Sequence, residues 1–442
     1  MHPRSAAPAE RPTRVRYRII LFLFLLTTVN YADRATLSIT GSDISRQFAL
    51  SPVTMGYLFS AFGWAYVIGQ IPGGWLLDRY GSKRIYWWSI TLWSALTVAQ
   101  GFTGWLPASL AVAGLFALRF LLGLAEAPSF PANSRIVASW FPAAERGTAS
   151  AIFNAAQYFA TVLFAPLMGS IAHAFGWPPV FWVMGGLGVV FAAVWSRSIY
   201  SPREHPRANA AEVRHIANGG GLVDLDAPGR ANPVPWAAVR ALLGSRMMLG
   251  IYFGQYCINT LTWFFLTWFP VYLVKERGFT ILQAGFAAAV PALCGFAGGI
   301  LGGVVSDQLL RKGRTLTVAR KTPIMIGLLL ATSMIICNYV STGWLVIAIM
   351  SLAFFGKGVG ALGWAVIADA SPKEITGFSG GLFNTFGNIA SIVTPIGIGY
   401  ILDRTGSFTG ALVFVSAHAI AAMASYLLVV GEIKRLEIQP AG

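Results

Sequence analysis

Charged residues are scarce in this sequence, and their scarcity excludes most soluble proteins. Only 11% of the 442 residues are Asp, Glu, Lys or Arg, whereas charged residues make up about 25% of an ordinary soluble domain. Hydrophobic residues make up 55%, and the mean hydropathy is +0.62. Such a chain would expose large apolar patches in water, but a lipid bilayer accepts them. The composition therefore predicts a protein that crosses a membrane many times.

Cysteine is also scarce, and the residue patterns of enzymes and metal sites are missing. Cys257, Cys294 and Cys337 lie in apolar stretches without a C-x-x-C pair or a nearby histidine, so we expect no disulfide, no metal and no cofactor. The sequence has no G-x-x-x-x-G-K-[ST] loop for ATP and no nucleophile constellation, which argues against an ATP-driven pump and an enzyme. The net charge of +15 predicts no nucleic-acid partner, because the basic residues lie between apolar runs.

Twelve apolar stretches are long enough to cross a bilayer, which takes about 20 mostly apolar residues in a helix. The first follows several arginines, as a signal peptide does. It continues through Asp33 and Arg34 without a small-residue cleavage site, so we interpret it as an uncleaved helix. The expected fold class is an all-α membrane protein with spans at residues 17-40, 52-77, 85-104, 108-138, 146-172, 178-199, 245-273, 281-306, 322-340, 343-369, 375-402 and 408-430.

The distribution of basic residues predicts the orientation of these spans. An even number of spans places both termini on one side, and loops on the cytoplasmic side are enriched in Lys and Arg. The side that holds the termini carries 25 Lys and Arg, the opposite side carries 4, and the remaining 3 lie within spans. Both termini are therefore predicted to be cytoplasmic.

An internal repeat divides the spans into two halves of six. Gly74 and Asp78 follow the second span, and Gly303 and Asp307 follow the eighth, 229 residues later. Six spans per half keep both repeats in one orientation, so their pseudo-two-fold axis runs along the membrane normal. The long polar stretch near the middle predicts a linker. The expected domains are a cytoplasmic tail at 1-16, an N-terminal half at 17-199, a cytoplasmic linker at 200-243, a C-terminal half at 244-430 and a cytoplasmic tail at 431-442.

The polar turn after the second span resembles the signature of the major facilitator superfamily. The sequence there reads G-x-L-x-D-R-x-G-x-K-R, and a degenerate copy follows the eighth span. The resemblance implies a twelve-helix transporter with alternating access. We expect the motif's glycine to permit close helix contact and its aspartate to hold one conformation shut by meeting a helix N-terminus or an arginine across the interface of the halves. The alternative is that these charges only stop the helices at the headgroups. The motif residues are Gly74, Asp78, Arg79, Gly81 and Arg84.

Three longer segments resemble the anion:cation symporter family within that superfamily, and there the permeases for glucarate and galactarate. They are NYADRATLSI at residues 30–39, RFLLGLAEAPSFPANSR at 119–135 and the run from FGKGVG to GIGY at 355–400. The resemblance implies proton-coupled uptake of an organic anion into a bacterial cell.

Five charged residues lie inside the expected spans: Asp33, Arg34, Arg119, Glu126 and Lys357. Each costs roughly 2.5 to 3.5 kcal/mol to insert, so such residues usually face a cavity and serve function. Arg119 and Glu126 lie about two turns, or roughly 10 Å, apart on one helix face and can line one cavity. The alternative is that Asp33 with Arg34, and Arg119 with Glu126, are ion pairs that only hold helices together.

Two prolines follow Glu126 directly. Pro128 and Pro131 lie in the middle of a predicted span. A proline there leaves a backbone carbonyl without its helical partner, which is tolerated where a cavity supplies another. This pattern supports a cavity beside Glu126.

The resemblance assigns roles to several residues. Asp33 and Glu126 match the family's protonatable carboxylates, and Arg34 matches an arginine of its anion site. The chemistry agrees, because a desolvated carboxylate takes up a proton readily and a guanidinium binds a carboxylate through two parallel hydrogen bonds. We expect Arg119 to bind substrate as well. Polar and aromatic positions of the family's substrate site match Tyr31, Tyr66, Gln157, Trp364 and Asn384, each with simple packing as the alternative; Asn388 is added from helical spacing alone.

Lys357 departs from the pattern of the family's galactonate carriers, which have a neutral glutamine there; the glucarate and galactarate permeases share the lysine. These substrates carry a carboxylate at each end, so Lys357 is predicted to bind the second carboxylate opposite Arg34. Gly356 and Gly358 would let another backbone approach closely. The alternative is a lysine that extends to the membrane interface.

The sequence thus predicts a proton-coupled symporter that imports a sugar diacid across the bacterial inner membrane. A carrier of monocarboxylate sugar acids, hexuronates or tartrate is the first alternative, and a membrane sensor without transport is the second. The expected partners are a small organic anion, protons and the lipid bilayer, with the protein acting as a monomer.

Overall fold

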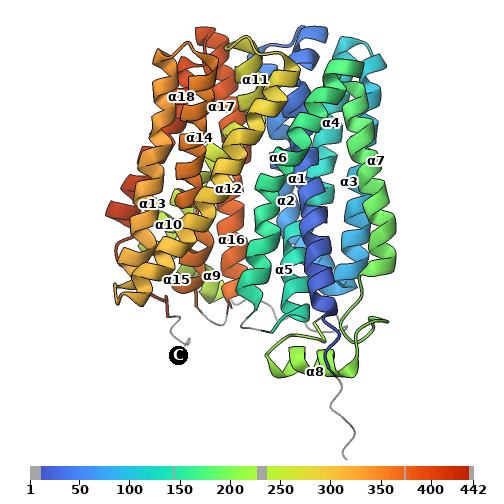
Figure 1. The fold of residues 1–442 in the computed structure, drawn as a ribbon, viewed down its shortest axis with the longest axis vertical. Coiled ribbons are helices and arrows are strands. Elements are labelled where there is room, and N and C mark those ends of the chain that lie inside the picture. Colours follow the sequence, from blue (N-terminus) through green and yellow to red (C-terminus); the bar gives the residue numbers. More distant parts are fainter. Residues whose placement is uncertain (1–10, 143–144, 226–235, 373–374, 438–442) are drawn as a thin grey trace, which may run out of the picture.

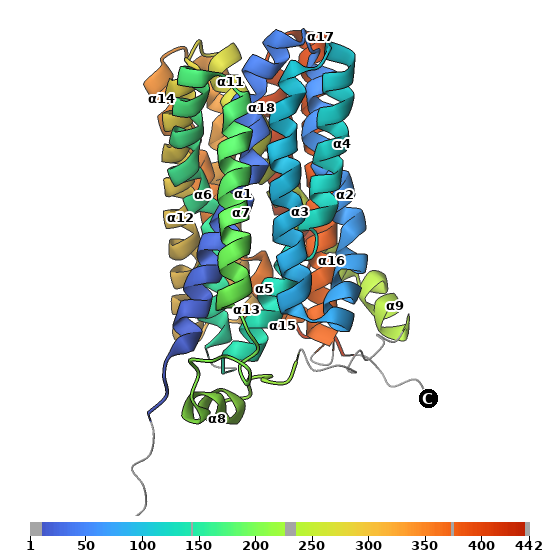
Figure 2. The same cartoon turned by 90° about the vertical axis from the view of Figure 1, so that its right-hand side faces the viewer.

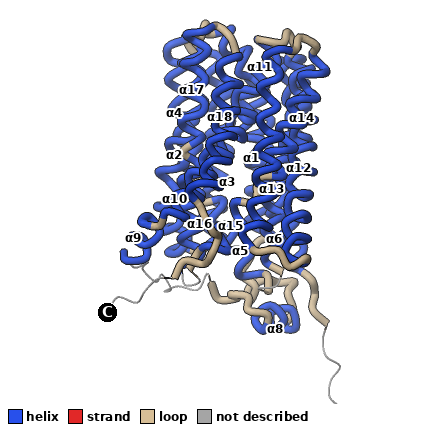
Figure 3. Tube along the Cα trace, turned by 90° about the vertical axis from the view of Figure 1, so that its left-hand side faces the viewer, coloured by secondary structure: helices blue, strands red, loops and turns tan. Residues whose placement is uncertain are grey.

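Long helices running side by side make up nearly all of the protein (Figure 1). The computed structural model describes residues 11–142, 145–225, 236–372 and 375–437. In these ranges it contains helices, turns and loops and no strand (Figure 3). Two short helices, α8 (Ala210–Asn218) and α9 (Trp236–Gly244), lie at one end of the bundle. We call this end the α8 end and the other one the opposite end.

The N-terminal half contains six membrane-crossing segments, the fourth of which is broken. Its elements are α1 (Val15–Gln47), α2 (Pro52–Tyr80), α3 (Ser82–Phe102), the short turn η1 (Thr103–Trp105), α4 (Ala108–Glu126), α5 (Ser129–Trp140), α6 (Arg146–Phe175) and α7 (Pro178–Ser198).

The C-terminal half also contains six segments, and most of them are interrupted by a change of helix type or a short break. Its elements are α10 (Arg246–Trp263), η2 (Phe264–Trp268), α11 (Phe269–Lys275), α12 (Ile281–Arg311), α13 (Leu316–Ala331), η3 (Thr332–Tyr339), α14 (Gly343–Val359), α15 (Gly363–Ala370), α16 (Thr376–Asn388), α17 (Ala390–Thr405), α18 (Thr409–Ala424) and η5 (Ser425–Val429).

The predicted twelve-span architecture is confirmed. Ten helical segments of the described residues are long and apolar enough to cross a membrane. Helices α2 and α3, which are rich in Gly, Ser, Trp and Tyr, fall outside that hydropathy criterion. Both nevertheless run along the bundle beside the other spans (Figure 2). The first helix begins and the last ends at the α8 end (Figure 1).

The first predicted span, 17-40, was too short, because α1 continues to Gln47. Its last two turns are polar in sequence but lie against protein instead of lipid. Ile44 and Ser45 are buried there, and a Cβ at Gly41 would lie 3.4 Å from Val271 of the C-terminal half. Hydropathy missed these turns because residues of both halves, including Met55 and Val271, cover them.

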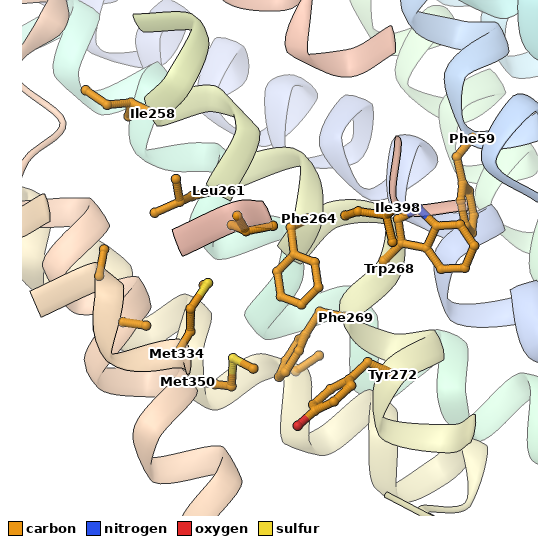
Figure 4. Close-up of a cluster of buried hydrophobic side chains, with 14 of the residues drawn as sticks. Phe59, Ile258, Leu261, Phe264, Trp268, Phe269, Tyr272, Met334, Met350 and Ile398 are labelled. Atoms are coloured by element: carbon orange, nitrogen blue, oxygen red, sulfur yellow. The ribbon is translucent and has the colours of Figure 1, made fainter. Parts of the chain in front are cut away.

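The two halves meet closely at the opposite end. A Cβ at Gly56 of α2 would lie 2.6 Å from the carbonyl oxygen of Pro395 on α17, and one at Gly285 of α12 would lie 2.6 Å from that of Ala165 on α6. Large apolar side chains fill the space between these contacts. Figure 4 shows Phe59 of α2 next to Trp268 of η2, with ring centroids 5.2 Å apart. The halves are therefore closed against each other at this end.

Within the C-terminal half, glycines allow the backbones of α12 and α14 to approach each other closely. A Cβ at Gly358 would lie 2.2 Å from the carbonyl oxygen of Gly295, and one at Gly302 would lie 2.3 Å from that of Val359. Gly356 makes a similar approach to Gly327 of α13. The expected close approach beside Lys357 is thus confirmed.

Helix α8 fixes the start of α1 through one buried carboxylate. The Glu212 side chain accepts hydrogen bonds from the Thr13 hydroxyl and from the backbone amides of Val15 and Arg16, at 2.5, 2.9 and 3.1 Å. These amides belong to the first turn of a helix, where backbone donors lack helical partners and attract negative charge. Burial raises the pKa of Glu212, but the hydrogen bonds from Thr13, Val15 and Arg16 outweigh burial and hold this pKa below its usual value.

The glycine contact of α14 predicts a large loss of stability in Gly358→Ala. The added Cβ meets backbone atoms that are unable to turn aside, and overpacking of this kind costs about 1 to 3 kcal/mol. We expect a lower melting temperature of the purified protein in detergent. The control is Gly186→Ala on α7, where a Cβ meets nothing within 4 Å. Equal melting temperatures would contradict the packing described for α12 and α14.

The Glu212 cap predicts a stability difference that depends on pH. Replacement by Gln removes hydrogen bonds to a charged group, each worth about 1.5 to 3 kcal/mol. Because the folded-state pKa is lowered, this contribution is present above the ordinary carboxyl range and is lost as the pH falls through the folded-state value. Glu212→Gln should therefore melt earlier than the wild type at pH 7 but not in acid. The exposed Glu204→Gln serves as the control, and a difference that persists in acid would argue against the cap.

Candidate functional site

A buried ion pair joins α1 and α4 inside the N-terminal half. The Arg34 Nε atom lies 2.8 Å from Oε2 of Glu126, and the two side chains are 3% and 0% exposed. Both charges are far from water, so each depends on the other for its stability. The sequence alternative of ion pairs within each helix is wrong for this state, since Arg34 and Glu126 pair across the two helices.

Three aromatic rings surround the Arg34 guanidinium. The Cζ atom lies 4.8 Å from the ring centroids of Tyr31, Phe62 and Tyr66. Cation-π contacts of this kind gain strength when the cation is desolvated. The Nη2 atom of Arg34 has no hydrogen-bond partner in the described part of the chain. The cage thus holds the guanidinium in place and leaves one of its edges unpaired.

Arg119 binds the backbone of α1 instead of a carboxylate. Its Nη1 and Nη2 atoms donate to the carbonyl oxygens of Asp33 and Arg34, at 3.4 and 3.2 Å. The side chain is 1% exposed. Among the described residues neither oxygen of the Asp33 carboxylate has a hydrogen-bond partner. Arg119 therefore holds the backbone of α1 beside the charged pair. Neither Arg119 nor Glu126 lines the described cavity between the halves, so the cavity predicted from their spacing stays a prediction.

The two prolines after Glu126 separate α4 from α5. Pro131 lacks the N–H that would bond the carbonyl of Ala127, and the Gln70 amide of α2 donates to that carbonyl at 3.4 Å. A Cβ at Gly73 of α2 would lie 3.1 Å from Pro128. The break is thus closed by α2, and it turns the first residues of α5 toward α1.

Lys357 is buried on α14, with 4% of its surface exposed. Its Nζ atom donates to the Tyr158 hydroxyl of α6 at 3.3 Å. The same ammonium lies 5.2 Å from the ring centroids of Tyr158 and Phe354. The lysine does not extend to the membrane interface in this state, which excludes the alternative considered from the sequence.

A cavity of about 40 Å³ lies between the two halves, and it is lined by Tyr31, Gln157, Tyr158, Thr161, Thr262, Phe265, Leu266, Phe269, Ala288, Ala292 and Phe354. Tyr31 touches Arg34, and Tyr158 bonds Lys357. Arg34 and Lys357 therefore each contact a tyrosine that lines this cavity. The volume holds about three waters, so the cavity is contracted in this state.

The remaining predicted substrate residues lie in α15 and α16. Trp364 is 45% exposed and packs edge-on against Phe383. The Asn388 amide donates to the carbonyl and the side-chain oxygen of Asn384, at 2.8 and 3.0 Å. None of these three predicted residues lines the described cavity. Their role in substrate binding stays a prediction.

The predicted gating motif forms the turn between α2 and α3. Gly81 has a φ of 80° and is the single residue between the helices, which confirms the short turn. Asp78 forms an ion pair with Arg135 of α5. Arg135 belongs to the same half, so Asp78 makes this ion pair within its own half in the present state; its expected contact across the interface of the halves in another conformation stays a prediction. A hollow of about 540 Å³ beside this turn is lined by Lys83 and Arg84 and lies away from the charged centre.

The glycine expected to permit close contact, Gly74, has no atom within 4 Å of an added Cβ. The contact is made one residue earlier, at Gly73. The second half repeats this shift: Gly303 is open, whereas Gly302 touches Val359. A run of two glycines gave no signal about which of them faces the neighbouring helix.

Sequence reasoning missed Tyr158, which links Lys357 to the cavity, and Phe62, which completes the cage around Arg34. Neither carries a charge, and aromatic residues are common in membrane spans. Asn30 was also missed, although a polar residue one turn before Arg34 was a usable signal. Both of its side-chain polar atoms are buried without a partner among the described residues.

Twelve membrane-crossing segments in two halves, with buried charges close to a cavity between the halves, are typical of membrane transporters. The sequence model of the Major Facilitator Superfamily matches residues 23–395. The chain belongs to this superfamily, which transports solutes and is not a class of enzymes.

Two bacterial transporters resemble the chain over nearly its whole length. It is 59% identical over 440 residues to the probable galactarate/D-glucarate transporter GudP of Escherichia coli strain K12, covering 99% of this chain and 98% of that protein. It is 62% identical over 437 residues to the transporter of the same name from Bacillus subtilis strain 168, covering 98% and 96%. The fold is similar to that of a D-xylose-proton symporter, with a TM-score of 0.73, 16% identity and coverage of 95% and 98%.

Proposed function

We propose that the protein imports a sugar diacid together with protons, by alternating access. Relatives at 59% and 62% identity carry the names of galactarate/D-glucarate transporters, which supports a sugar diacid as the substrate. The observation that carries the coupling mechanism is the buried ion pair of Arg34 and Glu126 next to the cavity. Two cations beside one cavity, Arg34 and Lys357, match the two carboxylates of such a substrate.

Arg34 exchanges its partner during this cycle. A guanidinium binds one carboxylate through two parallel hydrogen bonds, so Glu126 and the substrate compete for it. When Glu126 takes up a proton from the outer side, its hold on Arg34 weakens and the substrate carboxylate takes its place. When that proton leaves on the inner side, Glu126 pairs with Arg34 again and displaces the substrate.

Asp33 is the second proton carrier in this proposal. Its carboxylate is fully buried, and neither oxygen has a partner among the described residues. An unpaired buried charge is costly, and such a group takes up a proton instead. Arg119 is occupied by the backbone of α1 and leaves the Asp33 carboxylate unpaired. We therefore assign to Asp33 the second proton that is carried with each diacid.

Lys357 binds the second carboxylate from the C-terminal half. Its hydrogen bond to Tyr158 holds the ammonium behind the cavity wall. A rotation of the Tyr158 side chain would expose the ammonium to a ligand in the cavity. A diacid then joins Arg34 of one half to Lys357 of the other, which favours closure of the halves around a substrate with two charged ends.

The proposed orientation places the α8 end in the cytoplasm of a bacterial cell and both termini with it. The supporting observation is the excess of Lys and Arg in the loops of this side, 25 against 4. The opposite end, where the halves are closed in this state, then faces outward.

The carboxylates are tested by Asp33→Asn and Glu126→Gln. Each variant should abolish accumulation of labelled glucarate in proteoliposomes with an imposed pH gradient, because the proton carrier is lost. At least one should still bind glucarate, since binding and coupling are separable. The control is Asp43→Asn, which alters a partly exposed carboxylate near the end of α1. Undiminished accumulation by both site variants would refute this assignment.

Selectivity is tested by Lys357→Gln. Loss of one partner of a buried charge pair should weaken the binding of diacids by roughly 2 to 5 kcal/mol, whereas monoacids such as galactonate should be affected far less. Binding of both classes is measured by competition against labelled glucarate. The matched control is Lys275→Gln, a lysine of α11 that bonds Ser45 instead of reaching the cavity. Equal losses for glucarate and galactonate would show that Lys357 only supports the fold.

A further inference from the structure

Two rows of polar side chains face each other between the ion pair and the α8 end. One row lies on α1, where the spacing of three and four residues keeps the side chains on one helix face. The other row combines Glu126, the last residue of α4, with Ser129 and Asn133, which are four residues apart on α5. Seven residues of helix span about 10 Å. The facing residues are Arg34, Asn30 and Thr27 on α1, and Glu126, Ser129 and Asn133 on α4 and α5.

At both ends of the two rows, the facing side chains bond each other across the gap. The residues in the middle of the rows, Asn30 and Ser129, do not. Arg34 and Glu126 form the ion pair, and the Asn133 amide donates to the Thr27 hydroxyl at 3.0 Å. Between them, Asn30 and Ser129 are each 1% exposed. Neither side chain has a hydrogen-bond partner of normal geometry in the described part of the chain.

Further unpaired polar atoms surround this gap. They include Oε1 of Glu126, which lies next to the Asn30 amide. They also include Oδ1 of Asn133 and the Tyr86 hydroxyl of α3, which lie next to each other. Buried polar groups of folded proteins are nearly always bonded to protein or to ordered water, and a buried water makes about three hydrogen bonds. The donors and acceptors gathered here suit water molecules.

Apolar side chains end both rows on the side of the α8 end. The next position on the face of α1 is Leu23, and the next on α5 is Ile136; they are 0% and 3% exposed and belong to one apolar cluster. Water and protons therefore find no polar route from this gap along these helices. We call the buried polar atoms between the two rows, which include a carboxylate oxygen of Glu126, the polar pocket.

We propose that Asn30 and Ser129 hold water against Glu126 and that this pocket stabilises Glu126 while Arg34 binds the substrate. The inference rests on the proposed proton coupling. Asn30 Oδ1 accepts the hydrogen bond of protonated Glu126. After the O–H bond breaks and the proton passes to water of the substrate cavity, Asn30 Nδ2, the Ser129 hydroxyl and the pocket water donate to the carboxylate until Arg34 returns. Both residues are positioning residues, since neither touches the substrate.

Other charged and titratable groups also face Glu126, and they influence its proton binding together with the pocket. Arg34 is its direct partner, and the remaining groups influence it through space. These groups are Asp33 and Tyr31 on α1, Tyr86 on α3 and Arg119 on α4. All of them stay unchanged in the variants below, so a changed pH response reports on the pocket.

The test compares two transport modes of the full-length protein in proteoliposomes. Accumulation of labelled glucarate under a pH gradient requires Glu126 to release its proton, whereas glucarate counterflow at equal pH does not require net proton release. In Asn30→Leu and Ser129→Ala the ionised carboxylate loses donors, so accumulation should fall about tenfold or more and should require a higher internal pH. Counterflow should stay near the wild-type rate, and Ser129→Thr, which keeps the hydroxyl, should restore accumulation.

The control is Thr40→Val, which removes a buried hydroxyl of α1 that bonds only the backbone of its own helix among the described residues. An equal fall of accumulation and counterflow, or no change in either, would overturn the proposal. If Asn30→Leu fails to fold, the comparison of Ser129→Ala with Ser129→Thr tests the proposal. If the wild type itself fails to accumulate glucarate under a pH gradient, the proposed function fails. If the wild type accumulates glucarate and the Asn30 and Ser129 variants accumulate it equally well, only the proposed role of the pocket is refuted.

Discussion

The ion pair of Arg34 and Glu126 is the interaction on which the proposed cycle depends. In the apolar interior, neither charge is stable alone. The pair therefore stays together until something else compensates both groups, namely a proton for Glu126 and a substrate carboxylate for Arg34. The cost of an unpaired buried charge thereby links proton binding to substrate binding, and no long-range signal between distant sites is required.

No ion pair among the described residues joins the two halves, although hydrogen bonds do, such as those of Lys275 to Ser45 and of Lys357 to Tyr158. Asp78 pairs with Arg135 inside the N-terminal half, and Arg320 pairs with Asp369 at 2.8 Å inside the C-terminal half. At the opposite end, the halves meet through glycines and apolar rings. Ion pairs and hydrogen bonds hold each half together as a unit. An interface of apolar packing with few hydrogen bonds and no described ion pair can separate and close again, as alternating access requires.

The sequence predicted the parts of the structure that leave a periodic or chemical trace. Twelve spans and two halves follow from hydropathy and from the repeat of Asp78 as Asp307, and the buried charges are costly enough to mark function. Contacts that depend on how helices face each other could not be predicted from the sequence. The sequence did not distinguish Gly73 from Gly74, because both present the same residue type and only helix rotation decides which one makes contact.

The partners of the buried charges could likewise not be predicted from the sequence. Arg34 is next to Asp33 along the chain, yet it pairs with Glu126, because neighbouring residues of a helix point in different directions. Lys357 carried a visible signal as a buried cation. Its partner Tyr158 did not, since a tyrosine in a membrane span serves packing as often as function. Such partners become visible only when the helices of both halves are placed together.

The number of protons carried with each diacid tests the central claim most directly. Three buried cations, Arg34, Arg119 and Lys357, and two ionised carboxylates leave the empty site with one net positive charge. Two protons and a dianion restore that same charge, and they also remove the cost of about 4.6 kcal/mol for moving a dianion into a cell against 100 mV. Reversal potentials of glucarate flux in proteoliposomes measure this number. The account predicts at least two protons per diacid; one proton per diacid would contradict it.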